Sequence, residues 1–133
     1  AAGGAAAGGG EKKGAVTFRG RPSRVLLLKN VVAPGEVDAE LRGEVGSECS
    51  KYGEVVDVLV HELAAGATGA GGAPLAEEQR VRVFVKFSKP GAAMKAYIGL
   101  DGRYFGGRHI WVCFFKEADF DGRSLDPSPS EPK

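Results

Sequence analysis

The chain has 133 residues, of which 43% are hydrophobic and 26% are charged, so it can bury one core of ordinary size but not two. Its formal net charge of +1 argues against a domain that grips nucleic acid mainly through a basic surface, because neutralising phosphates takes clustered Lys and Arg. No apolar run reaches the roughly 18 residues needed to cross a bilayer. The sequence does not begin with Met, and we interpret it as a piece of a longer protein or a processed chain.

Both ends of the sequence lack a core-forming pattern. Residues 1–22 open with the Gly/Ala-rich run AAGGAAAGGG, and residues 121–133 read DGRSLDPSPSEPK, with three prolines. Segments of this composition bury little apolar surface, so we predict that both ends are disordered. One folded domain is then expected over residues 23–120.

The first predicted strand covers residues 24–32 and ends before Pro34, because proline has no backbone donor for a strand ladder. A helix is expected over residues 36–52. Its apolar residues recur at every fourth position and form one inward stripe, made of Val37, Leu41, Val45 and Cys49.

Three further elements follow a second strand, which is expected over residues 54–62. After a long loop without periodicity, a third strand covers residues 80–87. Ser88 is positioned to cap a second helix that runs to Leu100, and the last strand covers residues 109–115. This βαββαβ order predicts an α+β, ferredoxin-like sandwich, in which a four-stranded antiparallel sheet carries both helices on one face.

Alternation along the last two strands assigns the two faces of the sheet. The residues that should face the helices are Val81, Val83, Val85, Phe87, Ile110, Val112 and Phe114. The residues that should lie on the open face are Arg80, Arg82, Phe84, Lys86, His109, Trp111, Cys113 and Phe115. We expect Trp111 and Phe115 to pack under a terminal extension. Cys49 and Cys113 form no CxxC or Cys/His cluster, so we expect core thiols rather than a disulfide or a zinc site.

The third strand, RVRVFVKF, matches the K/R-G-F/Y-G/A-F-V-x-F/Y signature in position and spacing, so the chain resembles the RNA-recognition motif (RRM) family. Members of that family stack RNA bases on aromatic side chains of the sheet. Here Leu27 and Arg82 occupy two of the stacking positions, and only Phe84 remains aromatic. Two missing stacks remove roughly 2–6 kcal/mol of RNA affinity.

Two further features resemble the UHM family, RRM-like domains that recognise peptides. The first is an Arg-x-Phe motif before the last strand, supplied by Arg103-Tyr104-Phe105 within DGRYFGGR. The second is an acidic first helix, whose five carboxylates and two cations give a net charge of −3. These carboxylates belong to Glu36, Asp38, Glu40, Glu44 and Glu48. The resemblance covers about residues 24–120.

The resemblance implies a function and a site. A tryptophan of a partner peptide would enter a slot between the two helices and the Arg-x-Phe loop, with Lys or Arg beside it facing the acidic helix. The peptide-binding residues implied are Asp38, Glu44, Glu48, Arg103, Tyr104 and Phe105. The chain would then be a nuclear interaction domain that regulates pre-mRNA splicing and splice-site choice. Its partners would be spliceosomal proteins that recognise the branch site and the polypyrimidine tract and carry Trp-containing ligand motifs.

Two other functions remain open at this point. The first is direct but weak binding of single-stranded RNA on the open sheet face, through Lys29, Arg82, Phe84 and Trp111. The second is an acylphosphatase-like enzyme of the same fold, but we find no catalytic constellation in the loops and predict a protein that is not an enzyme. We also expect no cofactor, metal, small-molecule substrate or membrane partner.

Overall fold

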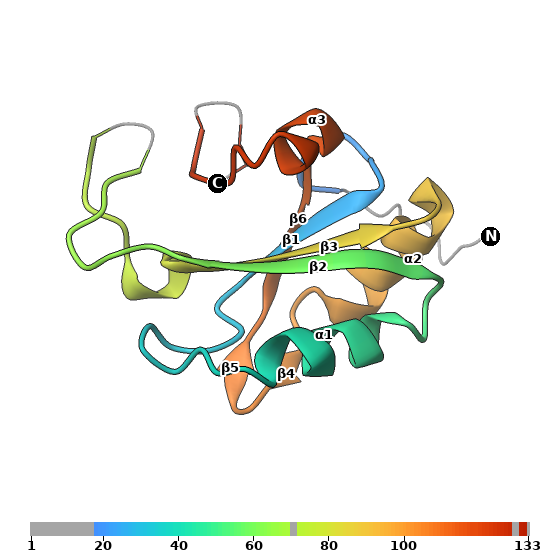
Figure 1. Cartoon of the computed structure of the whole chain (residues 1–133), viewed down its shortest axis with the longest axis horizontal. Helices are drawn as coiled ribbons and strands as arrows, with labels where there is room; N and C mark the ends of the chain where they lie inside the picture. The colour runs from blue at the N-terminus through green and yellow to red at the C-terminus, as the bar shows by residue number, and fades with distance from the viewer. Residues whose placement is uncertain (1–17, 70–71, 129–130, 133) are drawn as a thin grey trace, which may run out of the picture.

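The computed structural model describes residues 18–69, 72–128 and 131–132 (Figure 1). Disorder was predicted for residues 1–22; residues 1–17 lie outside the described residues, and of the remainder Phe18 packs against the main core and Arg19 pairs with Asp101. The strands are β1 (Val25–Lys29), β2 (Val55–Glu62), β3 (Val81–Phe87), β4 (Tyr104–Phe105), β5 (Arg108–His109) and β6 (Trp111–Phe115). The helices are α1 (Leu41–Cys49), α2 (Pro90–Leu100), α3 (Glu117–Asp121) and the short 3₁₀ helix η1 (Glu77–Gln79). None of the helices in the described part of the chain is long and apolar enough to cross a membrane.

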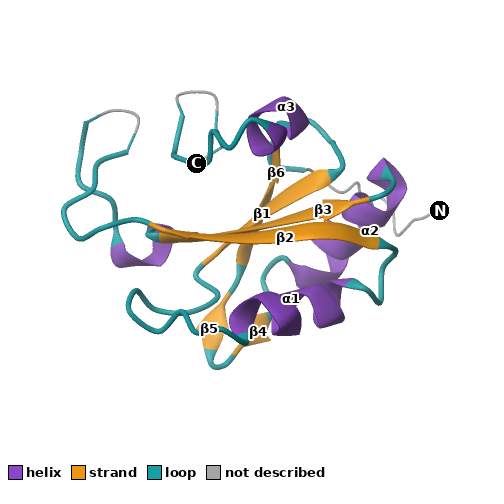
Figure 2. Cartoon of the chain, in the orientation of Figure 1, coloured by secondary structure: helices purple, strands orange, loops and turns teal. Residues whose placement is uncertain are grey.

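The four longer strands form one antiparallel sheet in the order β2-β3-β1-β6. In this sheet Leu27 of β1 lies opposite Phe84 of β3 on one side and Cys113 of β6 on the other. Figure 2 shows α1 and α2 together on one side of the sheet and α3 on the other side. The α+β, ferredoxin-like βαββαβ fold predicted from the sequence is therefore confirmed.

The helical face of the sheet carries the main core, which contains every residue that the alternation assigned to this face. From α1 it takes Leu41, Val45 and Cys49, so the predicted inward stripe is confirmed for these three residues. Helix α1 is shorter than the predicted 36–52. Before it, the carboxylate of Asp38 accepts hydrogen bonds from the backbone N–H groups of Glu40 and Leu41, at 3.0 and 2.9 Å. The residues of this turn are the ones that the sequence pattern had assigned to the first part of the helix.

Helix α2 begins at Pro90, which suits a first helical turn because proline has no N–H to satisfy there. The predicted cap by Ser88 is wrong, since the capping position belongs to Lys89 and no side chain caps the helix. Helix α2 also lies very close to the loop after α1. A Cβ atom at Gly53 would stand only 2.4 Å from the Cβ of Ala92, so this contact requires glycine.

A second, smaller core lies on the other face of the sheet. Its buried members are Val25, Leu27, Phe84, Cys113, Phe115 and Phe120. Phe120 comes from α3, and its ring lies 6.3 Å from that of Phe84. Phe115 and Trp111 pack with Phe120 and Leu125 of the chain that follows β6, so the terminal extension expected over these two residues is this chain. Cys49 and Cys113 are free, buried thiols, as predicted, and burial raises the pKa of each to about 12.

The chain after α3 also contacts the sheet, although the sequence predicts disorder for residues 121–133. Leu125 packs against the second core, and Glu131 pairs with Lys29 and Arg82. Composition indicates disorder because the segment is rich in proline and polar residues. The contacts come instead from single side chains, and the average composition of a segment does not reveal them.

Candidate functional site

The Arg-x-Phe motif lies on a small β-hairpin that the sequence did not predict. Strands β4 and β5 pair with each other, and the two residues between them, Gly106 and Gly107, have φ angles of +60° and +84°. Positive φ at both central residues is the requirement of a two-residue type I′ turn, which glycine meets without strain. The predicted strand 109–115 is therefore divided, with His109 in the hairpin and β6 starting at Trp111.

Asn30 anchors this hairpin to the end of β1. Its side-chain oxygen accepts hydrogen bonds from Nε and Nη2 of Arg108, at 3.1 and 2.6 Å. Its amide nitrogen donates to the carbonyl oxygen of His109 at 3.0 Å. Asn30 has φ of +67°, a conformation that asparagine adopts more readily than most residues. Sequence reasoning missed this anchor, for which the only signal is an Asn directly after a strand.

The three residues of the motif differ in exposure. Arg103 is exposed, and its Nη1 donates to the carbonyl oxygen of Gly99 at 3.1 Å, near the C-terminal end of α2. Tyr104 is 74% exposed and lies beside His109, with 5.0 Å between ring centroids. Phe105 is half-buried and packs against the main core. The motif therefore presents two exposed side chains, those of Arg103 and Tyr104, and the partly exposed ring of Phe105.

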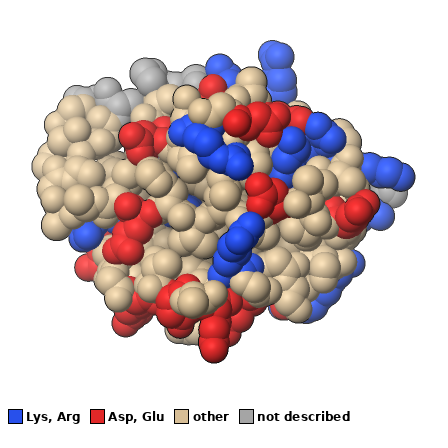
Figure 3. Space-filling model, in the orientation of Figure 1, with Lys and Arg blue, Asp and Glu red and all other residues tan. Residues whose placement is uncertain are grey.

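The three acidic residues implied by the resemblance have different roles in the structure. Asp38 is exposed, but its carboxylate caps the turn before α1. Glu48 forms an ion pair with Lys51, with 2.7 Å between Oε2 and Nζ. Glu44 is exposed and forms no ion pair with any residue in the described ranges. Figure 3 shows acidic side chains gathered along the lower edge of the molecule, where Figure 1 places the loop before α1 and the start of α1.

Both parts of the predicted peptide site lie on the helical side of the sheet. Phe105 packs against the same core cluster that contains the buried stripe of α1. Arg42, the one cation within α1, points to β2 instead, where its Nε donates to the carbonyl oxygen of Val58 at 2.6 Å and its Nη2 approaches Asp57 at 3.2 Å. This leaves the carboxylate of Glu44 as the uncompensated charge on α1.

The open-face residues considered for RNA binding lie beneath the chain that follows β6. Phe84 and Arg82 are fully buried, Lys29 is 6% exposed, and Trp111 is half-buried. Arg82 donates to the carbonyl oxygen of Leu125 at 2.7 Å and to the carboxylate of Glu131. In this conformation the sheet offers no free aromatic pair on which RNA bases could stack.

Glu131 is the charged residue that closes this surface. Its side chain is only 7% exposed, and its Oε2 lies 2.7 Å from Nζ of Lys29. Burial raises the pKa of Glu131, but the hydrogen bonds and charges of Arg82 and Lys29 outweigh burial and hold it below its ordinary value. The carboxylate is therefore ionised at neutral pH and paired with two cations.

The geometry defines the class of the domain. The chain is similar to the solved structure of the RNA15 RRM, with 20% identity, a TM-score of 0.53 and coverage of 77% of this chain and 100% of that chain. It is also similar to the Mip6 RRM3 domain, with 24% identity, a TM-score of 0.50 and coverage of 70% and 93%. These likenesses show the fold, which is that of an RNA-recognition motif.

The chain belongs to the family described as "Domain of unknown function (DUF8489)", whose model matches residues 27–120. It is 46% identical over 116 residues to DNA-damage-repair/toleration protein 111 of Arabidopsis thaliana, covering 87% of this chain and 28% of that protein. It is 42% identical over 105 residues to splicing factor 45 of Homo sapiens, covering 79% and 23%. Poly(U)-binding-splicing factor PUF60 of Mus musculus is 35% identical over 108 residues, with 81% and 18% covered. The chain spans less than a third of each of these relatives.

Proposed function

We propose that this domain binds a short peptide containing a tryptophan, and that it does so as a nuclear interaction module in pre-mRNA splicing. The assignment to splicing is supported by relatives that are named splicing factors. The peptide would come from spliceosomal proteins that recognise the branch site or the polypyrimidine tract. The residues proposed to contact it are Asp38, Glu44, Glu48, Arg103, Tyr104 and Phe105.

One observation carries this proposal: the two faces of the domain differ in what they leave accessible. The sheet face, where an RRM stacks RNA bases, is buried at Leu27, Arg82 and Phe84. The hairpin on the opposite side leaves Tyr104 exposed and Phe105 half-exposed. The hairpin therefore leaves two aromatic rings accessible where a peptide would bind, whereas on the face where RNA would bind Phe84 is buried and only Trp111 is partly exposed.

The chemistry of this side suits an indole next to a basic residue. An arginine cation and an aromatic edge can contact the two faces of one indole ring, and burying 150–250 Å² of it yields about 4–6 kcal/mol before ordering costs. Micromolar binding corresponds to about 8 kcal/mol, so charge pairing has to add to this. The carboxylate of Glu44, free of ion pairs among the described residues, would supply it.

The proposal is tested by calorimetric titration of a Lys/Arg-rich peptide that contains one tryptophan. Phe105→Ala should weaken binding at least about tenfold, because truncating a buried aromatic contact costs more than 1.4 kcal/mol. Glu44→Lys should weaken it about as much, since it replaces attraction to the basic residues by repulsion. Asp38 is a poor probe, because its substitution also removes the cap before α1.

The matched control is Glu78→Lys, which makes the same change of charge at an exposed position on η1. This variant should bind the peptide as the unmodified chain does. Unchanged binding by both Phe105→Ala and Glu44→Lys would show that the peptide site is not at the hairpin and α1.

A further inference from the structure

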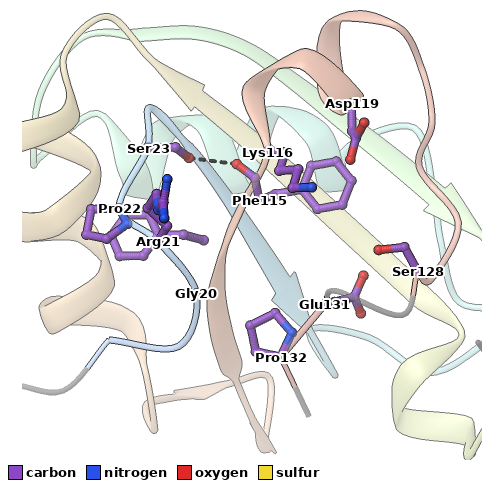
Figure 4. Close-up of a pocket in the computed structure, with 11 residues that line it drawn as sticks. Gly20, Arg21, Pro22, Ser23, Phe115, Lys116, Asp119, Ser128, Glu131 and Pro132 are labelled. Atoms are coloured by element: carbon purple, nitrogen blue, oxygen red, sulfur yellow. Dashed lines mark hydrogen bonds between the residues drawn. The ribbon is translucent and has the colours of Figure 1, made fainter.

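A cavity of about 480 Å³ lies between the chain that follows α3 and residues 20–23, which come before β1. The charged and hydroxyl-bearing residues that matter in its lining are Arg21, Lys116, Asp119, Ser128 and Glu131. Figure 4 shows the hydroxyl of Ser128 turned toward this space, with Ser128 and Glu131 on one side of it and Arg21 on the other. A group added to the hydroxyl of Ser128 therefore has room to extend into the cavity.

Two cations at this cavity have no counter-ion in the described part of the chain. Arg21 and Lys116 are exposed at its wall, and their side chains form no ion pair with any residue in the described ranges. The carboxylate of Asp119 offsets one of these two charges. The carboxylate of Glu131 is already outweighed by the two buried cations that it pairs with. The surroundings of Ser128 therefore have an excess of two positive charges, one from each group.

The sequence around this hydroxyl is typical of a substrate of proline-directed protein kinases. Ser128 is followed by Pro129, and no other Ser or Thr of the 133 residues directly precedes a proline. A residue before proline favours extended backbone, which is the conformation in which kinases bind their substrates.

The segment that carries Ser128 can also leave the surface of the domain. Residues 122–128 contain no helix or strand, and a second cavity, of about 560 Å³, is also lined by Ser128. Among the side chains of these residues, Leu125 is the one that packs against the second core. Opening of the segment therefore loses little apolar contact, whereas α3 itself is held by Phe120.

We propose that Ser128 is a phosphorylation site and that its phosphate, held by Lys116 and Arg21, fastens the chain after α3 to the folded domain. In this reaction Oγ of Ser128 attacks the γ-phosphorus of ATP bound to a proline-directed kinase. The new O–P bond forms as the bond to the leaving ADP breaks, and the hydroxyl proton passes to a base of the kinase. The inference is independent of the proposed peptide site.

Charge and connectivity both favour this outcome of the modification. A phosphoserine carries close to two negative charges at neutral pH, which match the excess positive charge around the cavity. The backbone N–H of Glu131 donates to the carbonyl oxygen of Ser128 at 3.1 Å. The phosphate would therefore add a second charged anchor to the segment that Glu131 already holds on the sheet.

The first measurement identifies the modified residue. The 133-residue chain is incubated with ATP and, in separate reactions, with a cyclin-dependent kinase and a mitogen-activated protein kinase, and its peptides are mapped by mass spectrometry. The unmodified sequence and Ser124→Ala should each take up one phosphoryl group, at Ser128, and Ser128→Ala should take up none. Ser124 is the matched control because it is exposed in the same segment but precedes Leu125 rather than proline. Failure of both kinases to modify Ser128 would overturn the proposal.

The second measurement shows whether the cavity holds the phosphate. In a pH titration followed by ³¹P NMR, the phosphoserine pKa should lie about half a unit or more below its ordinary value of about 6, because nearby cations favour the dianion. Lys116→Gln should shift this pKa back toward the ordinary value, and adding Arg21→Gln should restore it. Lys95→Gln removes the same charge at an exposed position on α2 and should leave the pKa unchanged.

The third measurement is thermal melting of the phosphorylated and unphosphorylated chains. Phosphorylation should raise the melting temperature by about 4 °C or more, as one added charge-assisted contact does in a domain of this size. A melting temperature that stays the same or falls would refute the proposal, since repulsion from Asp119 and Glu131 would then outweigh the two cations. A phosphate pKa equal to that of a free phosphoserine peptide would refute it as well. Both readings use the unmodified sequence, so they decide the question even if a variant fails to fold.

Discussion

At the residue scale, the tail carboxylate of Glu131 shows how one side chain can hold a surface closed. It satisfies two cations that are themselves almost fully buried, Arg82 and Lys29. Removing one partner of a buried ion pair is costly because it leaves charge in a poorly solvated place. We therefore expect Glu131→Gln to lower the free energy of unfolding at neutral pH by roughly 1–3 kcal/mol.

The pH dependence of this effect follows from the lowered pKa of Glu131. The carboxylate stabilises the folded chain above its ordinary pKa of 4.5, and that stability is lost as pH falls below this value through the folded pKa. Urea unfolding of the unmodified chain and Glu131→Gln should therefore differ at pH 7, and the difference should shrink as the pH falls below 4.5. A difference between the two that stays constant over this range would show that Glu131 is not paired in solution.

At the element scale, two glycines in or beside α1 should respond in opposite directions to substitution by alanine. Gly43 is exposed within α1, and an added Cβ would meet nothing within 4 Å, so Gly43→Ala should stabilise the fold by about 1 kcal/mol through helix propensity. Gly53→Ala should destabilise it by about 1–3 kcal/mol, because its Cβ would collide with Ala92.

Urea unfolding of the two alanine variants measures both effects. Each variant is also the control for the other, since the chemical change is the same and only the surroundings differ. A stabilising Gly53→Ala would mean that the loop after α1 does not lie against α2 as the structure has it.

At the scale of the whole molecule, the sheet lies between two hydrophobic cores, one on each of its faces. The smaller core depends on α3, whose Phe120 is 1% exposed against Phe84. Phe120→Ala should cost about 3–5 kcal/mol in unfolding free energy, as truncation of a buried Phe does. Ile98→Ala on the outer face of α2, where Ile98 is 57% exposed, should cost less than about 1 kcal/mol.

Thermal melting and urea unfolding compare these two truncations. A Phe120→Ala variant as stable as Ile98→Ala would indicate that α3 does not cover the sheet in solution. It would also mean that Phe84 is exposed on the face of the sheet opposite α1 and α2.

The order of strands and helices could be read from the sequence, because side-chain alternation and four-residue spacing are local consequences of burying one face. The same pattern placed Arg82 and Trp111 on the face opposite the helices, and the structure has them there. The Arg-x-Phe motif could also be recognised in the amino-acid sequence. Its role as a peptide site came from a resemblance, and it remains a proposal.

Only the tertiary structure decided what lies against those residues. The type I′ hairpin depends on Asn30, a residue far along the chain from Gly106, and the cover of the sheet depends on Phe120 and Glu131 meeting partners in β1 and β3. Such contacts join positions that no local period connects. The amino-acid sequence by itself determined the layers and their faces, whereas the packing of the chain decided what covers the face of the sheet opposite α1 and α2.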